Sequence, residues 1–220
     1  MKHVVITGAN RGIGLELARH YRAEGWRVTG VCRESSPELE EAAAQIINGI
    51  DVTSKESIDR LVGALRGQTI DLLINNAGLM LNETLGSLDF DSLRLQMEIN
   101  AFAPLRICEA LLPNLPAGSK IANLTSRMGS IADNDSGGRY GYRASKAAFN
   151  ALGRSLAIDL KERNIAVAQL HPGFVITRMV NFAGIITPEE SVIGLAERIE
   201  ALNLENTGSF WHSNGEELPW

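Results

Sequence analysis

Short apolar runs alternate with helical patterns along most of the chain. Six runs are typical of buried strands: His3–Thr7, Arg27–Cys32, Ile46–Ile50, Ile70–Asn75, Lys120–Thr125 and Ile165–Leu170. Ser209–Ser213 is a candidate for a final strand. Most of these runs are apolar at successive positions rather than at every second one. That pattern is typical of strands covered by helices on both faces.

Helical patterns occupy the segments between these strands. The candidates are Gly12–Glu24, Pro37–Gln45, Ser54–Arg66, Asp89–Leu112, Tyr140–Arg163 and a last helix that ends at about Ala201. Thr53 and Glu56 form a capping-box pattern, and Thr187 followed by Pro188 marks the start of the last helix. Repeated strand–helix alternation predicts a three-layer, doubly wound α/β fold with a parallel sheet of about seven strands. We expect a single domain over residues 1–220.

Composition narrows the classes of partner. The 220 residues are 45% hydrophobic and 21% charged, which is ordinary for a globular protein. A net charge of −5, a pI near 5.5 and scattered basic residues argue against a nucleic-acid partner. No apolar run approaches the ~18 residues of a membrane span, and a strand that starts at His3 leads us to expect no signal peptide.

The cysteines and histidines suggest neither a disulfide framework nor a metal site. Cys32 and Cys108 lack disulfide or metal spacing, and the four histidines are scattered. We therefore expect a reduced, cytoplasmic compartment and no metal.

A glycine-rich turn joins the first strand to the first helix. Gly8, Gly12 and Gly14 let the backbone turn sharply and approach a pyrophosphate, whose charge faces the helix N-terminus. The spacing G-x-x-x-G-x-G differs from the familiar G-x-G-x-x-G, but its position between strand and helix indicates dinucleotide binding. The alternative is a tight turn without a ligand.

The end of the second strand bears on the choice of cofactor. A nicotinamide dinucleotide site usually has an acid there for a ribose hydroxyl, or an arginine for a 2′-phosphate. Here Cys32 is followed by Arg33, and Arg11 in the glycine loop could reach the same phosphate. This favours NADP (NADPH) over NAD. Glu34 could instead bind a ribose, and Arg33 could be an ordinary surface charge.

Tyr142 and Lys146 stand four residues apart in a predicted helix, which places them on the same face. A cation beside a phenol stabilises the phenolate and lowers its pKa, so Tyr142 could act as a general acid or base. Neither Tyr21 nor Tyr140 has such a partner. The alternative is a chance pair of solvated residues.

Several motifs stand in a characteristic order along the chain. They are Thr7-Gly8-x-x-x-Gly12-x-Gly14, Asp51-Val52, Asn75-Asn76-Ala77-Gly78, Asn100, Thr125-Ser126, Tyr142-x-x-x-Lys146 and Pro172-Gly173-x-x-x-Thr177. With these motifs, essentially the whole chain resembles the short-chain dehydrogenase/reductase superfamily. The segment after Ser126 and the ending around Trp220 resemble its C-factor-type branch.

The resemblance implies a Rossmann fold and a set of roles. Tyr142 would be the acid/base, Lys146 would lower its pKa and hold the nicotinamide ribose, and Ser126 would bind the substrate oxygen. Asn100 would support a water-linked proton path to Lys146. The implied cofactor-binding positions are Gly8, Asn10, Arg11, Gly12, Ile13, Gly14, Arg33, Asp51, Val52, Asn76, Ala77, Gly78, Tyr142, Lys146, Pro172, Gly173, Val175 and Thr177.

Two departures from the family pattern affect this assignment. Sixteen positions separate Ser126 from Tyr142, more than is usual, with extra residues in an exposed loop at Asp133–Gly138, so Ser130 is the fallback. The segment between Thr177 and Thr187 is short for a substrate lid. Its apolar residues still suggest a cover over the site: Met179, Phe182, Ile185 and Ile186. We interpret His171 as a strand-end residue and Cys32 as packing.

The sequence therefore predicts an NADP-dependent oxidoreductase that reduces a ketone or aldehyde to an alcohol, or runs in reverse on a small-molecule alcohol. A pteridine reductase-like role is a lesser possibility on the same fold. The alternative class is an NAD(P)-binding signalling or regulatory protein of the C-factor type with little or no turnover. The resemblance also suggests a homodimer or homotetramer built on the helices at Asp89–Leu112 and Tyr140–Arg163. The identity of the carbonyl compound does not follow from the sequence.

Overall fold

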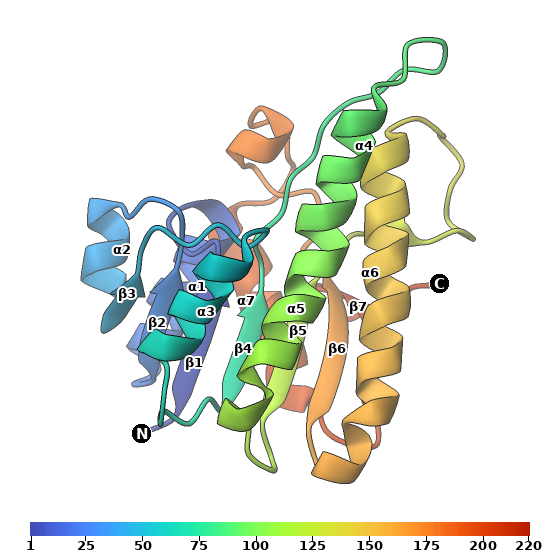
Figure 1. Cartoon of the computed structure of the whole chain (residues 1–220). Helices are drawn as coiled ribbons and strands as arrows, with labels where there is room; N and C mark the ends of the chain where they lie inside the picture. Colours follow the sequence, from blue (N-terminus) through green and yellow to red (C-terminus); the bar gives the residue numbers. More distant parts are fainter.

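A seven-stranded, all-parallel sheet forms the centre of the computed structural model, which describes residues 1–220 (Figure 1). The strand order is β3-β2-β1-β4-β5-β6-β7. The strands are β1 (His3–Thr7), β2 (Arg27–Val31), β3 (Gln45–Ile47), β4 (Leu72–Asn75), β5 (Lys120–Leu124), β6 (Ala166–His171) and β7 (Phe210–His212). The order reverses between β1 and β4, and in such sheets ligands bind beyond the carboxyl ends at that reversal.

Helices cover both faces of the sheet. They are α1 (Gly12–Ala23), α2 (Pro37–Ala42), α3 (Lys55–Ala64), α4 (Phe90–Met97), α5 (Ala103–Leu111), α6 (Tyr140–Asp159) and α7 (Pro188–Ala201). Helices α1, α2 and α7 pack on one face, and α3, α5 and α6 on the other (Figure 1). The predicted three-layer, doubly wound fold is confirmed.

Alternate residues of each strand enter the two hydrophobic cores. On β1, Val4 and Ile6 pack into the core under α1 and α7, whereas Val5 packs into the core under α3 and α5. Because both faces of the strand are buried, both sets of positions have to be apolar. This is the physical origin of the continuous apolar runs in the sequence.

Three buried amide side chains link the central strands. Asn75, Asn123 and Gln169 are register partners on β4, β5 and β6. Asn75 Nδ2 donates to Asn123 Oδ1 (2.9 Å), and Asn123 Nδ2 donates to Gln169 Oε1 (2.6 Å). Gln169 Nε2 then donates to the carbonyl oxygen of Phe149 on α6 (2.7 Å). This amide ladder fixes α6 to the sheet.

Several of the predicted helices and strands begin or end at the wrong residue. The third strand ends at Ile47 because Asn48 and Gly49 form a turn, with Gly49 at φ +71°. The second helix ends at Ala42 rather than at Gln45, which belongs to β3. The third helix begins after Ser54, whose hydroxyl accepts from the Ser57 N–H, so the capping box predicted at Thr53 does not form.

Of the two long predicted helices, the first is interrupted and the second ends early, at Asp159. The segment predicted as Asp89–Leu112 contains a π-helical turn, η1 (Glu98–Phe102), between α4 and α5, and short 3-10 turns follow α5 and α6. The capping box at Thr187 and Glu190 is present, and α7 ends at Ala201 as predicted. No helix is both long and apolar enough to cross a membrane.

Candidate active site

The glycine loop folds against the end of β4. Gly8 has a left-handed φ of +66°, and a Cβ on it would lie 3.0 Å from Ala77 Cα. Asn76 Nδ2 donates to the carbonyl oxygens of Thr7 (2.9 Å) and Gly8 (3.0 Å). The Thr7 hydroxyl in turn accepts from the N–H groups of Asn76 and Ala77. Two predicted cofactor segments are thereby held together.

The first turn of α1 is free to receive an anion. Arg11 at its N-cap is extended and makes no capping hydrogen bond through its side chain, and no acid lies in the first turn. The N–H groups there have no intrahelical acceptors, and the helix dipole favours negative charge at this end. The loop therefore fits the pyrophosphate of a dinucleotide, with Gly12, Ile13 and Gly14 in the turn.

Two exposed arginines border this loop. The Ser36 hydroxyl donates to the Asn10 carbonyl oxygen (3.0 Å), so the loop after β2 lies against the glycine loop. Neither Arg11 nor Arg33 forms an ion pair. Hydrogen bonds from Thr53 lower the pKa of Asp51, and the charge of Arg33 contributes less in the same direction.

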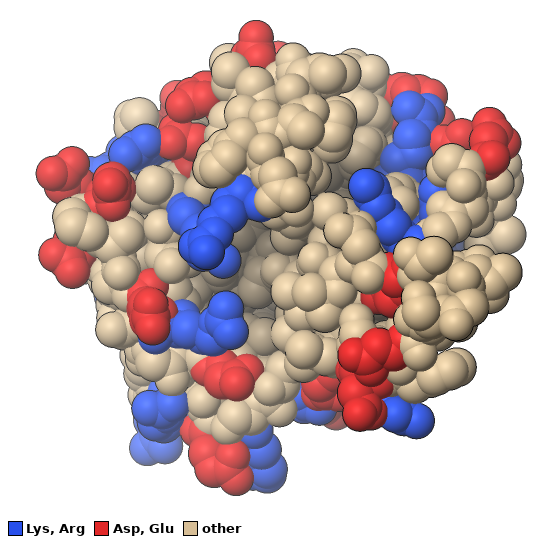
Figure 2. Space-filling view, turned by 90° about the horizontal axis from the view of Figure 1, so that it is seen from above, with Lys and Arg blue, Asp and Glu red and all other residues tan.

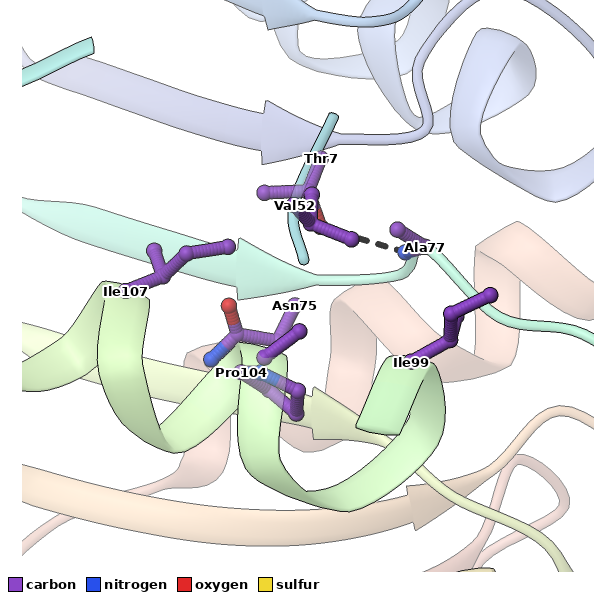
Figure 3. Close-up of a pocket in the computed structure, with 8 residues that line it drawn as sticks. Thr7, Val52, Asn75, Ala77, Ile99, Pro104 and Ile107 are labelled. Atoms are coloured by element: carbon purple, nitrogen blue, oxygen red, sulfur yellow. Dashed lines mark hydrogen bonds between the residues drawn. The ribbon is translucent and has the colours of Figure 1, made fainter. Parts of the chain in front are cut away.

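A small hollow lies beside the end of β4, between that strand and α5 (Figure 3). Val52 and Ala77, both predicted to border the adenine, line it together with Asn75 and Thr7. The structure thus brings the segment after β3 next to the segment after β4.

The segment after β6 reaches the glycine loop from the other side. Gly173 has a left-handed φ of +90°, and Ile186 lies against the position that a Cβ would take there. The methyl group of Thr177 lies 3.5 Å from the Cβ position of Gly12. Val175 is buried and pairs with Ile186 in an isolated bridge, while the Pro172 carbonyl accepts from the Ser191 hydroxyl (2.6 Å).

Tyr142 and Lys146 lie one turn apart on α6, and both are buried. Lys146 Nζ donates to the Leu124 carbonyl oxygen at the end of β5 (2.9 Å). It lies 5.9 Å from the centroid of the Tyr142 ring and 5.3 Å from that of Phe149. The pair is therefore not the solvated coincidence that the sequence left open.

The predicted lowering of the Tyr142 pKa is wrong for this structure. Burial raises the pKa of the phenol, and the Ser126 side chain and the Arg139 charge oppose that shift only in part. Burial also lowers the pKa of Lys146 to about 7. The reason is desolvation, which disfavours the charged form of each group. A phenol with a raised pKa is protonated at neutral pH.

Asn100 occupies the middle of the π-helical turn η1. Its Oδ1 accepts from the Leu79 N–H (2.8 Å), and its Nδ2 donates to the Leu79 carbonyl (2.7 Å) and to Ser145 Oγ (3.0 Å). Lys146 Nζ and Asn100 Oδ1 both lie within 4 Å of the Cβ position of Gly78. Asn100 and Lys146 are thus neighbours, and π-helical turns of this kind are frequent at functional sites.

The structure separates the two candidate serines. Ser126 is buried at the end of β5, next to Tyr142, and its hydroxyl accepts from the Met128 N–H (3.1 Å). Ser130 Oγ is committed elsewhere, because it donates to the Trp220 carbonyl (3.0 Å) and accepts from the Asp133 N–H (3.1 Å). The geometry favours Ser126 over Ser130 as the partner of the phenol.

The short segment predicted as a lid forms a compact turn. Its ends are joined by hydrogen bonds from Ile176 N–H to the Ile186 carbonyl and from Ile185 N–H to the Phe174 carbonyl. Phe182 and Ile185 are 67% and 79% exposed, so they present apolar surface to solvent. Figure 2 shows a hollow at the face that carries the carboxyl ends of the strands, with basic side chains at its margin.

The structure agrees with the other two single-residue interpretations. His171 ends β6, and burial lowers its pKa to about 3. Cys32 is buried, and burial raises the pKa of its thiol, so the reactive thiolate is disfavoured. The sequence did not predict that the Leu124 carbonyl oxygen accepts a hydrogen bond from Lys146, because every residue has a backbone carbonyl and its type does not reveal this role.

The sheet, glycine loop, and buried tyrosine and lysine define a dinucleotide-binding oxidoreductase fold. Residues 2–184 match the family model described as short chain dehydrogenase, and the chain belongs to this family.

Two relatives of known name are similar over much or all of the chain. The 1-hydroxy-2-glutathionyl-2-methyl-3-butene dehydrogenase of Rhodococcus sp. strain AD45 is 40% identical, and the match covers 100% of both chains. The C-signal protein of Myxococcus xanthus is 42% identical over 154 residues, which cover 69% of this chain and 93% of that protein.

Solved structures of carbonyl reductases are also similar. The NADPH-bound carbonyl reductase from chicken fatty liver has a TM-score of 0.91 at 30% identity, with 100% of this chain and 99% of that chain covered. A carbonyl reductase from Pseudomonas aeruginosa PAO1 in complex with NADP has a TM-score of 0.88 at 33% identity, with 100% of both chains covered. These likenesses support a nicotinamide cofactor.

Proposed function

We propose that this protein is an NADPH-dependent reductase of ketones or aldehydes, with Tyr142 as the proton donor. The observation that carries the proposal is the placement of the Tyr142 phenol, which is buried beside Ser126 and one helical turn from Lys146. Reduction of a carbonyl needs a proton donor of this kind, whereas oxidation of an alcohol needs the phenolate. An ordinary phenol is protonated near pH 7, so Tyr142 can serve as this donor.

Each of the four catalytic candidates has a separate task in this proposal. The bound cofactor supplies the hydride. Tyr142 protonates the carbonyl oxygen, and Ser126 donates a hydrogen bond to the same atom, where negative charge develops. Lys146 would hold the nicotinamide ribose and return a proton to Tyr142. Asn100 orders the path by which a proton returns to Lys146.

The preference for NADPH rests on two guanidinium groups. Arg11 and Arg33 stand on adjacent loops, exposed and without a carboxylate partner, as a 2′-phosphate site requires. The nicotinamide cofactors named for the chicken and Pseudomonas structures are NADPH and NADP. Asp51 is engaged by Thr53, and this leaves Arg33 free to meet a phosphate.

Isotope transfer tests the reaction and the cofactor together. The protein is incubated with NADPH deuterated at either face of C4 and with a panel of aromatic aldehydes and aliphatic ketones. We expect one of the two labelled cofactors to place deuterium on the carbinol carbon, as detected by mass spectrometry. We also expect NADPH to bind about tenfold more tightly than NADH, and Arg33→Ala to reduce that ratio. Cofactor consumption without label in an alcohol, or tighter binding of NADH, contradicts the respective part.

The similarity to the C-signal protein supports a second candidate, a dinucleotide-binding regulator with little turnover. A protein that only binds the cofactor has no need of a buried proton donor, so the environment of Tyr142 favours the enzyme.

We also propose that the protein is a homodimer or homotetramer. Exposed apolar side chains lie along the outer helices α4 and α6 and the turn η1, namely Leu95, Phe102 and Ile158. These helices lie on the same side of the molecule (Figure 1). A monomer by light scattering at micromolar concentration contradicts this assembly.

A further inference from the structure

Glu83 is the only aspartate or glutamate of the chain whose side chain is buried. It lies in the irregular segment between β4 and α4, and it forms no ion pair. A carboxylate is costly to bury unless its oxygens accept hydrogen bonds. The hydrogen bonds that Glu83 accepts therefore have to offset the cost of its burial.

Three uncharged donors satisfy this carboxylate. Glu83 Oε1 accepts from the Gln96 side-chain amide and from Ser92 Oγ (3.2 Å), both on α4. Glu83 Oε2 accepts from the Gly141 N–H in the first turn of α6 (3.3 Å). Arg139, the N-cap of α6, provides no side-chain cap. Glu83 thus caps the catalytic helix from a distant segment, at the end where the helix dipole favours an anion.

Glu83 is the last member of a regular row of contacts. Asn100 holds Leu79 through both backbone groups, and Gln96, one turn earlier, accepts from the Leu81 N–H (2.9 Å). Gln96 and Asn100 are fully buried. Alternate residues of the segment between β4 and α4 therefore contact successive turns of α4 and η1. We call this row of hydrogen bonds the polar zipper and define it as Leu79, Leu81, Glu83, Gln96 and Asn100.

The polar zipper touches α6 on both sides of the catalytic tyrosine. Glu83 binds the N–H of Gly141, the residue just before Tyr142. Asn100 donates to Ser145 Oγ, and Ser145 Oγ donates to the Tyr142 carbonyl (2.9 Å). The backbone of Tyr142 is thus bracketed by two hydrogen-bonded attachments to one structure.

Gly141 shows how close this contact is. A Cβ at that position would lie 2.9 Å from Glu83 Oε1 and would also overlap the Gln96 amide. Gly141 is therefore required because the polar zipper approaches it so closely. Its backbone has ordinary helical angles, which any residue can adopt.

We propose that Glu83, with Gln96, is a positioning residue that sets the place of Tyr142 relative to the substrate carbonyl. This inference rests on the proposed function for its catalytic consequence. Near-attack geometry is sensitive to displacements of about 1 Å, which can lower a rate by about 10²-fold. Loss of the attachment at Gly141 therefore lowers kcat more than it changes the binding of substrate or cofactor.

Glu83→Gln tests the proposal, because it keeps the shape and replaces one acceptor oxygen by a donor. The new NH2 group has to face either the Gly141 N–H or the Gln96 amide, both of which are donors. We expect kcat to fall about tenfold or more, with KM and the NADPH Kd within about twofold of the wild-type values. Hydrogen exchange of the backbone over residues 140–146 accelerates. Asp91→Asn, an exposed position on α4, is the matched control and leaves both readouts unchanged.

The exchanged pair, Glu83→Gln with Gln96→Glu, separates positioning from a general loss of stability. In this double variant the amide group at position 83 donates to the carboxylate at position 96, and that carboxylate still accepts from the Leu81 N–H. The amide oxygen at position 83 then faces the Gly141 N–H. We expect kcat and hydrogen exchange to return to near the wild-type values, even if the single variant is unstable.

Two results overturn the proposal. One is a wild-type kcat in the single variant, and the other is a stable double variant that is as slow as the single one. If the wild-type protein has no turnover, the proposed function fails, and hydrogen exchange alone then decides whether Glu83 holds α6.

Discussion

The ammonium of Lys146 is buried and has one hydrogen-bond acceptor, the Leu124 carbonyl oxygen. Burial withdraws this cation from bulk water and disfavours its charged form. Its pKa of about 7 lies below the ordinary value of 10.5. Between these two values the unfolded chain binds more protons than the folded one, so this group makes folding more favourable as the pH rises. Below pH 7 the full cost of burying the charge applies.

Lys146→Met therefore stabilises the fold while it removes a catalytic candidate. Methionine has a similar length and carries no charge to desolvate. We expect Tm at pH 6.5 to rise by about 3 °C or more, and the gain over the wild-type protein to shrink towards pH 9.5. Differential scanning calorimetry at the two pH values measures both effects. A lower Tm at pH 6.5, or a gain independent of pH, contradicts this description of Lys146.

For single residues, the sequence predicts which side chains share a helix face better than it predicts which side chains are buried. The spacing of Tyr142 and Lys146 placed them on the same face of a helix, as found. The direction of the Tyr142 pKa shift was wrong because it depends on burial by segments far away in the sequence. Glu83 was missed for the same reason, since nothing in an irregular segment marks a carboxylate as buried.

At the scale of elements, the amide ladder dictates how closely α6 approaches the sheet. Gln169 lies directly against Gly153, where a Cβ would overlap its carboxamide. The glycine lets the helix come near enough for Gln169 to bond to the Phe149 carbonyl. Helix propensity alone would favour alanine at this position.

Gly153→Ala is expected to destabilise the protein by about 1–3 kcal/mol, because a methyl group is forced into a filled space. Gly63→Ala in α3 is the matched control, since no atom lies within 4 Å of its Cβ position. It is expected to stabilise by about 0.5–1 kcal/mol. Urea unfolding measures both changes. Equal effects of the two substitutions contradict the role given to the ladder.

The boundaries of helices and strands could be predicted where residues adjacent in the sequence determine them. The cap at Thr187 and Pro188 defines the start of α7 from neighbouring residues alone. The break in the long helix at η1 was not predicted, because Asn100 takes its position from contacts with Leu79 and Ser145. The third strand was predicted too long because Ile50 is apolar like Ile46 and Ile47, although Asn48 and Gly49 between them form a turn.

On the scale of the whole molecule, segments far apart in the sequence meet at one edge of the sheet. The glycine loop, the segments after β3, β4 and β6, and the start of α6 converge there (Figure 1). Strand–helix alternation predicts this convergence, since parallel strands end at the same edge. The strand order and the polar zipper could not be predicted from the sequence, because both depend on which distant segments become neighbours in the fold.

At the centre of this converging edge, the phenol of Tyr142 is proposed to give its proton to a carbonyl oxygen. Single-turnover oxidation of NADPH by Tyr142→Phe, with an aldehyde identified by isotope transfer, tests this role most directly. We predict a rate about 10²–10⁴-fold below the wild-type rate, with NADPH bound as tightly as before. Tyr140→Phe, which alters a partly exposed tyrosine in the same turn, retains the wild-type rate. A Tyr142→Phe protein that oxidises NADPH as fast as the wild type contradicts the proposed role.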